Sequence, residues 1–461
     1  MVVLDVVVTD SHGQPVRGLT GRDFRVIENG VEQKLASFEA PPLPRSQLSQ
    51  GRETISGSRD NSIPARNIMV LDELNTGVFD EAYARQSLEK YLRKHGPVLN
   101  QPTSLLIVGQ ERLEFAHDYT RDAAALKDAL KGHHAELPFS QMTGGAYRAV
   151  DRLAKTLWVL EQIASANRHY AGRKNVIWIG SGFPQLNLRS LAAQDRRNFA
   201  EAISTLAHEL SEARLVVYTI DPQGLEVAPT AYEDLFGDPT TGELLFEGLA
   251  PQTGGKIFRL QNQIDEAIAE SSEDGAAYYT LTYNPNNHNW DGQFRNVRVV
   301  VEGRGLQTRA RKGYYAVAES PLSAGEVDDA MSKALMSPIP YRGLDLHATV
   351  TQADEGAGKY VLRVDGDALN WQSLASGKRR CQVTVVTATM GAGAQFATHN
   401  VRELEAVAEA QNFRKPSDKP VVFSFVAELP RDTHYVKVVV RDSTNGNIGT
   451  TNISKDTIKL R

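Results

Sequence analysis

The residues with the clearest chemical potential follow one apolar run. Residues 67–71 read NIMVL, and Asp72, Asn75 and Thr76 come directly after them. The run predicts a buried strand that carries a carboxylate, an amide and a hydroxyl to its carboxyl end. Open α/β sheets bind ligands at that end, and Mg²⁺ prefers oxygen ligands of this kind. The stretch is therefore a candidate ion site, although a strand-end Asp can also simply cap the turn before a helix.

The elements that position these residues are of two kinds. Between residues 67 and 283, apolar runs alternate with amphipathic segments, which predicts strands alternating with helices. Continuous apolar strands between helices imply a doubly wound, mostly parallel sheet that is covered on both faces. Residues 2–40 and the segment after residue 277 show β patterns instead, with Asn29-Gly30 as a hairpin turn. The fold class expected is therefore α/β plus all-β.

The length of 461 residues favours two or three domains. Neither β flank has enough strands for a core of its own, so we hypothesise that the flanks pair with each other around an inserted α/β domain. About six further strands close the chain at the spacing of an antiparallel sandwich. The expected organisation is a β-rich domain of residues 1–45 and 277–318, a linker of residues 46–65, the α/β domain of residues 66–276, a linker of residues 319–337 and a C-terminal sandwich of residues 338–461.

Composition and charge exclude several classes of protein. No stretch of 18 apolar residues occurs, so we expect no membrane span. The net charge of −5 is small and no Lys/Arg stripe forms, so nucleic acid is not an expected partner. The single cysteine, Cys381, excludes an intrachain disulfide and a Cys-based metal site. We expect it to be a small core residue.

Seven segments occur in a defined order over about residues 2–316. They are TDSHGQPVRGLTGRDFRVIENGVEQKLASFE, NIMVLDELNT, GRKNVIWIGSGFP, VVYTIDPQGL, LAPQTGGKIF, YYTLTYNP and DGQFRNVRVVVEGRGLQTRARKGYYA. Together they resemble the von Willebrand factor A domain, and more closely the bacterial VWFA-related domain family first described as Acidobacterial. The resemblance implies a metal-ion-dependent adhesion site on three loops at the upper edge of the sheet. The region after Ser320 matches less sharply and looks like an immunoglobulin-like sandwich.

The first and third loops of that site are incomplete in this sequence. Asp72 and Thr76 match the first-loop pattern, but Leu74 stands where the family has a second hydroxyl. In the third loop, Ser181 stands where the family has an Asp, and Gly182 follows it. One oxygen ligand and one carboxylate are therefore missing, which weakens a Mg²⁺ site.

The second loop also departs from the pattern. Gly144 stands at the position of the family's Thr, and Thr143 lies one residue earlier. We therefore expect no tightly bound ion and no other cofactor. The alternative is Mg²⁺ or Mn²⁺ at a degenerate site, for which the candidate ligands are Asp72, Thr76 and Ser181.

The resemblance implies a non-catalytic, adhesion-like module that binds a partner protein at the upper edge of the sheet. It also implies a secreted or periplasmic, cell-envelope protein. The chain begins inside a β pattern without a signal peptide, so we expect either a trimmed chain or a cytoplasmic protein. The expected binding residues are Asp72, Asn75, Thr76, Thr143, Gly144, Ser181 and Gly182.

Two functional alternatives stay open. The first is capture of an acidic side chain by a divalent metal at Asp72 and Thr76. The second is a hydrolase with Ser181 as nucleophile, although the surrounding residues do not form the G-x-S-x-G motif. Two further expectations concern structural residues: His133 and His134 in a solvated loop, and Trp158 in the core.

Overall fold

The computed structural model describes residues 1–41, 64–134, 146–184, 192–222, 249–259, 263–318, 322–354, 356–391, 396–409 and 420–458. The chain divides into two compact units. The first contains residues 1–161 and 172–319, and the second contains residues 162–171 and 320–461. The expected linker of residues 46–65 lies outside the described residues except at its end. Among the helices described, none is long and apolar enough to cross a membrane.

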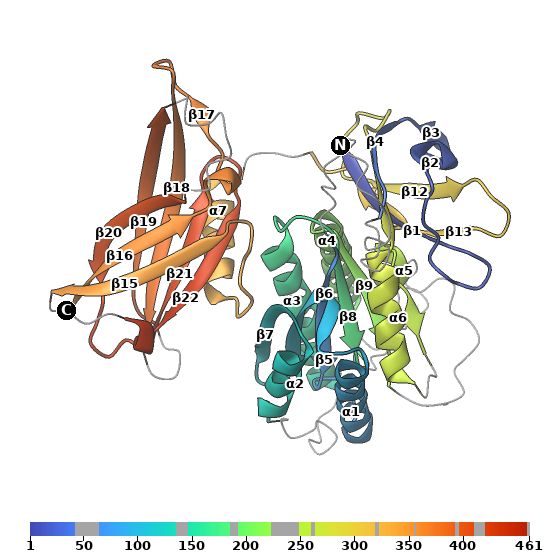
Figure 1. The fold of residues 1–461 in the computed structure, drawn as a ribbon, viewed down its shortest axis with the longest axis horizontal. Coiled ribbons are helices and arrows are strands. Elements are labelled where there is room, and N and C mark those ends of the chain that lie inside the picture. Colours follow the sequence, from blue (N-terminus) through green and yellow to red (C-terminus); the bar gives the residue numbers. More distant parts are fainter. Residues whose placement is uncertain are drawn as a thin grey trace, which may run out of the picture. The chain divides into compact units, whose positions relative to one another are not determined.

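A six-stranded sheet forms the centre of the first unit (Figure 1). In spatial order its strands are β10 (Ile257–Phe258), β9 (Leu215–Ile220), β8 (Lys174–Ile179), β5 (Arg66–Asp72), β6 (Val98–Val108) and β7 (Leu113–Asp122). β7 runs antiparallel to β6, and the other neighbours pair in parallel. The sheet is therefore mixed but mostly parallel, and the carboxyl ends of β5, β8 and β9 lie at one edge.

Helices alternate with these strands along the chain. They are α1 (Val78–Lys94), α2 (Ala123–Gly132), α3 (Ala146–Asn167), α4 (Ala193–Glu212), α5 (Leu249–Thr253) and α6 (Ile264–Ala276). The Asp122 side chain caps α2 by accepting from the N–H groups of Ala124 and Ala125. α1 ends before Gly96, whose φ of 83° a residue with a side chain rarely adopts.

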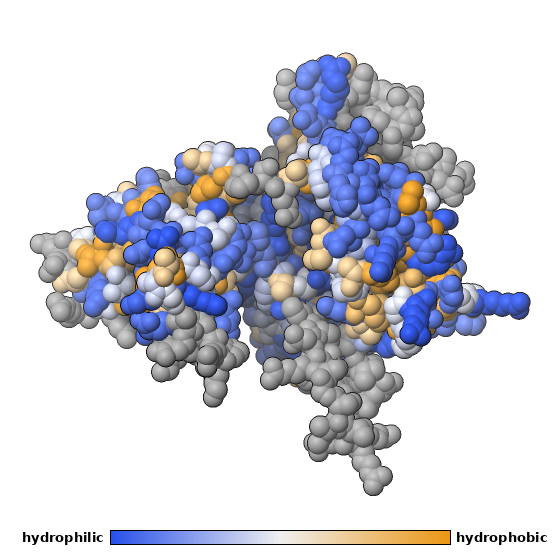
Figure 2. Space-filling model, turned by 90° about the horizontal axis from the view of Figure 1, so that it is seen from above, coloured by the Kyte–Doolittle hydropathy of each residue, from blue (hydrophilic) through white to orange (hydrophobic). Residues whose placement is uncertain are grey.

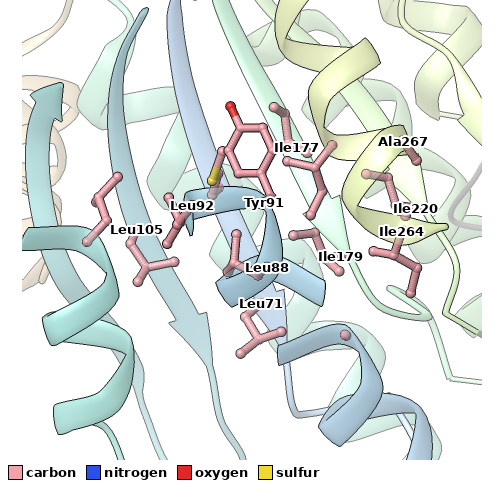
Figure 3. Packing of buried hydrophobic residues seen from close by; sticks show 14 of the residues in the cluster. Leu71, Leu88, Tyr91, Leu92, Leu105, Ile177, Ile179, Ile220, Ile264 and Ala267 are labelled. Carbon is pink, nitrogen blue, oxygen red and sulfur yellow. The ribbon is translucent and has the colours of Figure 1, made fainter. Parts of the chain in front are cut away.

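Side-chain alternation assigns each residue of β5 to one face of the sheet. Met69 and Leu71 pack with α1, α2 and α6 in one hydrophobic core. Figure 3 shows Leu71 close to Leu88 of α1. Neighbouring residues in a strand point to opposite faces. Asp72 therefore shares the second face with Val70, and Glu73 returns to the first. This alternation separates the two carboxylates that follow each other in the sequence.

The β segments of the first unit form two antiparallel sheets. One has the order β13-β1-β11-β4 and the other β14-β12-β2-β3. Their bounds are β1 (Val2–Thr9), β2 (Phe24–Glu28), β3 (Val31–Gln33), β4 (Leu35–Glu39), β11 (Tyr278–Tyr283), β12 (Phe294–Val301), β13 (Gln307–Arg309) and β14 (Gly313–Tyr315). Each sheet pairs strands from both flanks of the α/β segment. This is the pairing that the inserted-domain hypothesis requires, and its domain boundaries stay a prediction.

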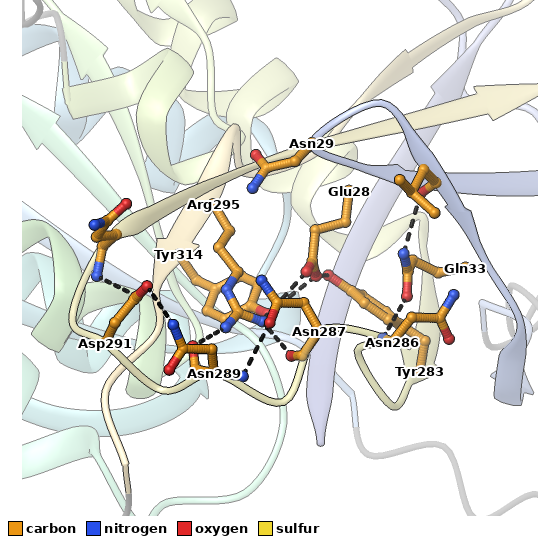
Figure 4. A network of polar contacts seen from close by, with 12 residues as sticks. Glu28, Asn29, Gln33, Tyr283, Asn286, Asn287, Asn289, Asp291, Arg295 and Tyr314 are labelled. Carbon is orange, nitrogen blue, oxygen red and sulfur yellow. Dashed lines mark hydrogen bonds and ion pairs between the residues drawn. The ribbon is translucent and has the colours of Figure 1, made fainter.

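A buried ion pair ties the two flanks together (Figure 4). The Arg295 guanidinium on β12 lies 3.4 Å from the Glu28 carboxylate on β2 and donates to the Asn287 carbonyl at 2.7 Å. The hydroxyls of Tyr283 and Tyr314 donate to the other Glu28 oxygen at 2.8 and 3.0 Å. Both charged side chains are thus buried with hydrogen-bond partners, as buried charges require.

The six-stranded sheet contacts the antiparallel sheets of the first unit near the amino ends of its parallel strands. Arg173, fully buried just before β8, donates to the Tyr218 hydroxyl at 2.8 Å, and that hydroxyl donates to Asp274 at 2.6 Å. Arg309 of β13 also pairs with Asp274. The carboxyl edge lies at the opposite end of the parallel strands, so these contacts do not involve it.

The second unit contains two antiparallel sheets around one hydrophobic core. The first is β15 (Leu346–Asp354), β16 (Ala357–Val364) and β20 (Val421–Glu428). The second comprises β17 (Gln372–Ser373), β18 (Lys378–Met390), β19 (Phe396–Glu409), β21 (Tyr435–Asp442) and β22 (Ile448–Ser454). Cys381 is buried in this core, so the expectation of a small core residue is confirmed.

The structure differs from the sequence-based expectations at three points. Residues 319–337, expected as a linker, contain α7 (Ala324–Met336), which is stabilised by a Ser323–Glu326 capping box and belongs to the second unit. The sequence did not predict a strand at β17 or at β19. Trp158 is 39% exposed, so the expectation of a core residue was wrong; it lies on the outward side of α3.

Candidate functional site

The carboxyl edge of the sheet brings together segments that lie more than 100 residues apart. We call residues 72–77, from the last residue of β5 onward, and residues 180–184, which follow β8, the rim. Asp72 is fully buried within it, and Thr76 is almost fully buried. Helix α3 contacts the same place through Thr156.

The Asp72 carboxylate is surrounded by N–H donors. Its Oδ1 accepts from the backbone N–H groups of Leu74 and Asn75, each at 3.0 Å. Its Oδ2 accepts from the Gly182 backbone at 2.7 Å and from the Trp178 indole at 3.2 Å. An ionised carboxylate offers about four acceptor sites. All of them are therefore used within the protein.

Thr76 and Gly180 bring the two rim loops into direct contact. The Thr76 hydroxyl accepts from the Ser181 backbone N–H at 3.1 Å. At Gly180 the backbone has a φ of 142°, and a Cβ there would lie 2.5 Å from both Asp72 Cβ and Thr76 Oγ1. Only glycine allows this approach without displacement of the neighbouring side chains.

Asn75 connects the rim to α3. Its amide nitrogen donates to the Gly182 carbonyl at 2.6 Å and to the Thr156 hydroxyl at 2.9 Å. The Thr156 hydroxyl lies 3.1 Å from the Gly182 carbonyl and 3.1 Å from the Arg152 carbonyl. Thr156 was missed in the sequence, because a Thr in a helix gives no signal of its contact with a distant loop.

Five of the seven expected binding residues therefore lie together, namely Asp72, Asn75, Thr76, Ser181 and Gly182. Thr143 and Gly144 lie outside the described residues. The five do not form an open cluster of ligands. The side chains of Asp72 and Thr76 accept from the backbone N–H groups of residues 182 and 181, and the Asn75 amide donates to the carbonyl of residue 182.

This arrangement does not fit a divalent metal. Such an ion needs oxygen lone pairs, and those of Asp72 already accept N–H groups. The Thr76 hydroxyl also serves as an acceptor, and Leu74 supplies no side-chain oxygen. Within the described ranges, no group of three His, Cys, Asp or Glu side chains could hold an ion.

Ser181 does not have the surroundings of an activated nucleophile. Its hydroxyl oxygen is buried and has no hydrogen-bond partner among the described residues. A nucleophilic serine requires a base within hydrogen-bond reach. The part of the chain that the structure describes places no histidine or carboxylate in that position.

A second polar cluster lies on the opposite face, where Glu73 points. Glu73 accepts from Arg85 of α1 at 2.5 Å and lies 3.1 Å from Nε2 of His133. The other ring nitrogen of His133 lies 2.8 Å from Glu114 of β7. His133 is buried, so the expectation of a solvated loop was wrong for this residue, whereas His134 is exposed. The cluster links α1, the end of α2 and β7 to Glu73 of the rim.

Acid titration of Asp72 gives the first prediction. Burial raises the pKa of its carboxyl to about 6, and the four N–H donors oppose the rise. Between about pH 4 and 6 the folded protein therefore binds a proton at Asp72 more readily than the unfolded chain does. We expect the unfolding free energy of the wild type, relative to Asp72→Asn, to fall by up to about 3 kcal/mol from pH 4 to pH 7. Urea unfolding at each pH measures it, and a constant difference would contradict it.

The close contact at Gly180 gives the second prediction. We expect Gly180→Ala to reduce the free energy of unfolding by about 2–4 kcal/mol, because the new Cβ meets Asp72 and Thr76 and the backbone conformation disfavours a side chain. Gly132→Ala at the end of α2 is the control, since nothing lies within 4 Å of its Cβ. Denaturant unfolding compares the two variants, and equal stabilities would show that the loops do not meet as described.

Comparisons with known proteins give little further information. No protein-family model and no curated protein matches the sequence. Among solved structures, the SpRpn10 VWA domain matches at 13% identity over 34% of this chain and 75% of that chain, with a TM-score of 0.20. Proximal thread matrix protein 1 from the mussel byssus matches at 12% identity over 47% of this chain and 49% of that chain, with a TM-score of 0.29. Both likenesses are weak.

Proposed function

We propose that the protein is a non-catalytic protein-interaction module that binds its partner at the rim without a metal ion. The observation that carries the proposal is the Asp72 carboxylate, whose acceptor sites are all filled by N–H groups of the protein itself. The residues that resemble an ion site thus serve to hold two loops in place.

A rigid rim is suited to recognition. Binding sites depend on elements that hold their surface in one geometry before the partner arrives. Here Asp72, Asn75 and Thr76 each bond to the loop after β8, and the Glu73 cluster fastens the neighbouring helices. The edge of an α/β sheet at the carboxyl ends of its strands is also the usual place for a ligand.

The proposal also includes a domain family for each unit and a cellular location. We take the α/β segment as a von Willebrand A-like domain with a degenerate adhesion site, and the second unit as an immunoglobulin-like spacer or second binding module. We propose a secreted or periplasmic location together with this domain family. The support is the resemblance of the sequence segments together with the convergence of Asp72, Thr76 and Ser181 at one edge.

Titration calorimetry with MnCl₂ tests the metal-free rim. We expect no saturable heat from the wild type after treatment with EDTA and dialysis, because an ion would have to displace the donors of Asp72. Thr76→Val is the matched variant. It removes the hydroxyl of Thr76, which is a candidate metal ligand, and keeps the shape of the side chain.

Two results would contradict the proposal. Saturable Mn²⁺ binding that Thr76→Val weakens would restore the metal-dependent alternative. Covalent labelling of Ser181 by a fluorophosphonate probe would show an activated nucleophile and restore the hydrolase alternative. Labelling is read by mass spectrometry, with the Ser181→Ala variant as the control.

A further inference from the structure

Strand β19 leaves one of its two edges without a partner. It runs from Phe396 to Glu409 and pairs along its length with β18. In the part of the chain that the structure describes, no strand pairs with its other edge. An open edge is a template for pairing with another chain, and natural proteins often block it with Pro, Lys or a bulge. β19 contains neither Pro nor Lys, and its pairing with β18 shifts register only at its first residues.

Hydrogen bonds between β18 and β21 reveal which residues of β19 face the open edge. The Gln382 carbonyl accepts from the N–H of Ser443, and the Met390 carbonyl accepts from the N–H of His434. Both donors adjoin β21, so the main-chain groups of the even-numbered residues of β18 point to β21 and those of the odd-numbered residues point to β19. The residues of β19 that pair with these odd-numbered ones are even-numbered. The odd-numbered residues of β19 therefore present their N–H and C=O groups to the open edge.

The side chains of these odd-numbered residues lie in solvent. Those from 397 to 405 are all exposed, namely Ala397, His399, Val401, Glu403 and Glu405, and Val401 is 60% exposed. A single exposed valine needs no explanation, because hydrophobic residues lie scattered among hydrophilic ones on the side of the molecule that Figure 2 shows. Val401 is distinguished by the main-chain groups beside it, which no described strand pairs. Its β-branched side chain suits a paired strand.

The neighbouring edge strand, β20, is blocked. It lies at the edge of the three-stranded sheet of the second unit. The Arg402 guanidinium of β19 donates to the Val426 carbonyl of β20 at 2.7 Å and lies over the ring of Phe425. Among the described residues, no side chain makes such a hydrogen bond to the odd-numbered main-chain groups of β19. The two edges therefore differ in their capacity to accept a further strand.

A second copy of β19 fits the open edge best with Val401 at the centre. In an antiparallel pair around a two-fold axis at Val401, the two Val401 side chains meet, and His399 of each copy lies opposite Glu403 of the other. The imidazole can donate to the carboxylate, so these cross-strand pairs are complementary. An axis at Arg402 would place two guanidinium groups opposite each other, and any axis from Glu403 to Val407 would oppose carboxylates.

We infer that the chain forms a homodimer through the open edge of β19, with the two strands antiparallel around a two-fold axis at Val401. The five-stranded sheets of two second units then become one continuous sheet. Main-chain hydrogen bonds supply affinity in strand addition, and side chains supply specificity. Here Val401 and the pairs of His399 with Glu403 set the register. The surface lies in the second unit, so the inference does not depend on the proposed function of the rim.

Sedimentation equilibrium of the full chain tests the inference. We expect the average mass to rise with protein concentration towards twice that of one chain. Val401→Lys should raise the dimer dissociation constant at least about tenfold, because it places two ammonium groups opposite each other at the axis. Val422→Lys is the control, since Val422 is 55% exposed on β20, and it should leave the constant unchanged. Glu403→Lys should also weaken the dimer, and adding His399→Glu should restore it by reversing the charge pair.

Cysteine cross-linking tests the register. Val401→Cys should give a disulfide-linked dimer on mild oxidation, because opposite Cα atoms in a hydrogen-bonded antiparallel pair lie about 5.5 Å apart, within reach of a disulfide. Val407→Cys, on the same face of β19, should not, because the two copies of residue 407 would lie about 40 Å apart. Cys381 is buried and does not compete.

Three results would overturn the inference. The first is a wild type that stays monomeric at every concentration. The second is an equal dimer dissociation constant for Val401→Lys and Val422→Lys, which would exclude the edge of β19. The third is cross-linking of Val407→Cys in preference to Val401→Cys, which would exclude an axis at Val401.

Discussion

The rim depends on one buried carboxylate and the N–H groups around it. Asp72 ends β5 fully buried, and its oxygens accept from Leu74, Asn75, Trp178 and Gly182. These donors come from the loop after β5, from β8 and from the loop after β8. Removing one partner of such a buried hydrogen bond costs about 1–3 kcal/mol, and more when the group left without a partner is charged. The positions of both loops, and of the start of α1 beyond them, follow from this contact.

The same interaction explains why a sequence that resembles an ion site need not bind an ion. In a metal site the cation provides the positive charge that a buried carboxylate requires. Here four N–H groups take that part, and Ser181 contributes its backbone N–H to Thr76 where a carboxylate ligand would be needed.

The sequence predicted the wound sheet and the edge at which Asp72 and Ser181 meet, but not several contacts around that edge. Apolar runs alternating with helical segments specify a wound sheet, and parallel strands bring Asp72 and Ser181 to one edge. The contact of Thr156 with the rim depends on how α3 packs, which periodicity does not encode. His133 meets Glu73 across 60 residues of sequence, and its neighbour His134 made both look like loop residues. β19 escaped notice because its Glu- and Ala-rich sequence has low strand propensity, and pairing with β18 along its length overrides that preference.

The most direct test is anomalous diffraction from crystals grown with excess MnCl₂. The account predicts no anomalous peak within coordination distance of the Asp72 oxygens, with the Gly182 amide and the Trp178 indole still at hydrogen-bond distance from them. A Mn²⁺ ion bound by Asp72 and Thr76, with those two donors turned away, would contradict the account at its centre.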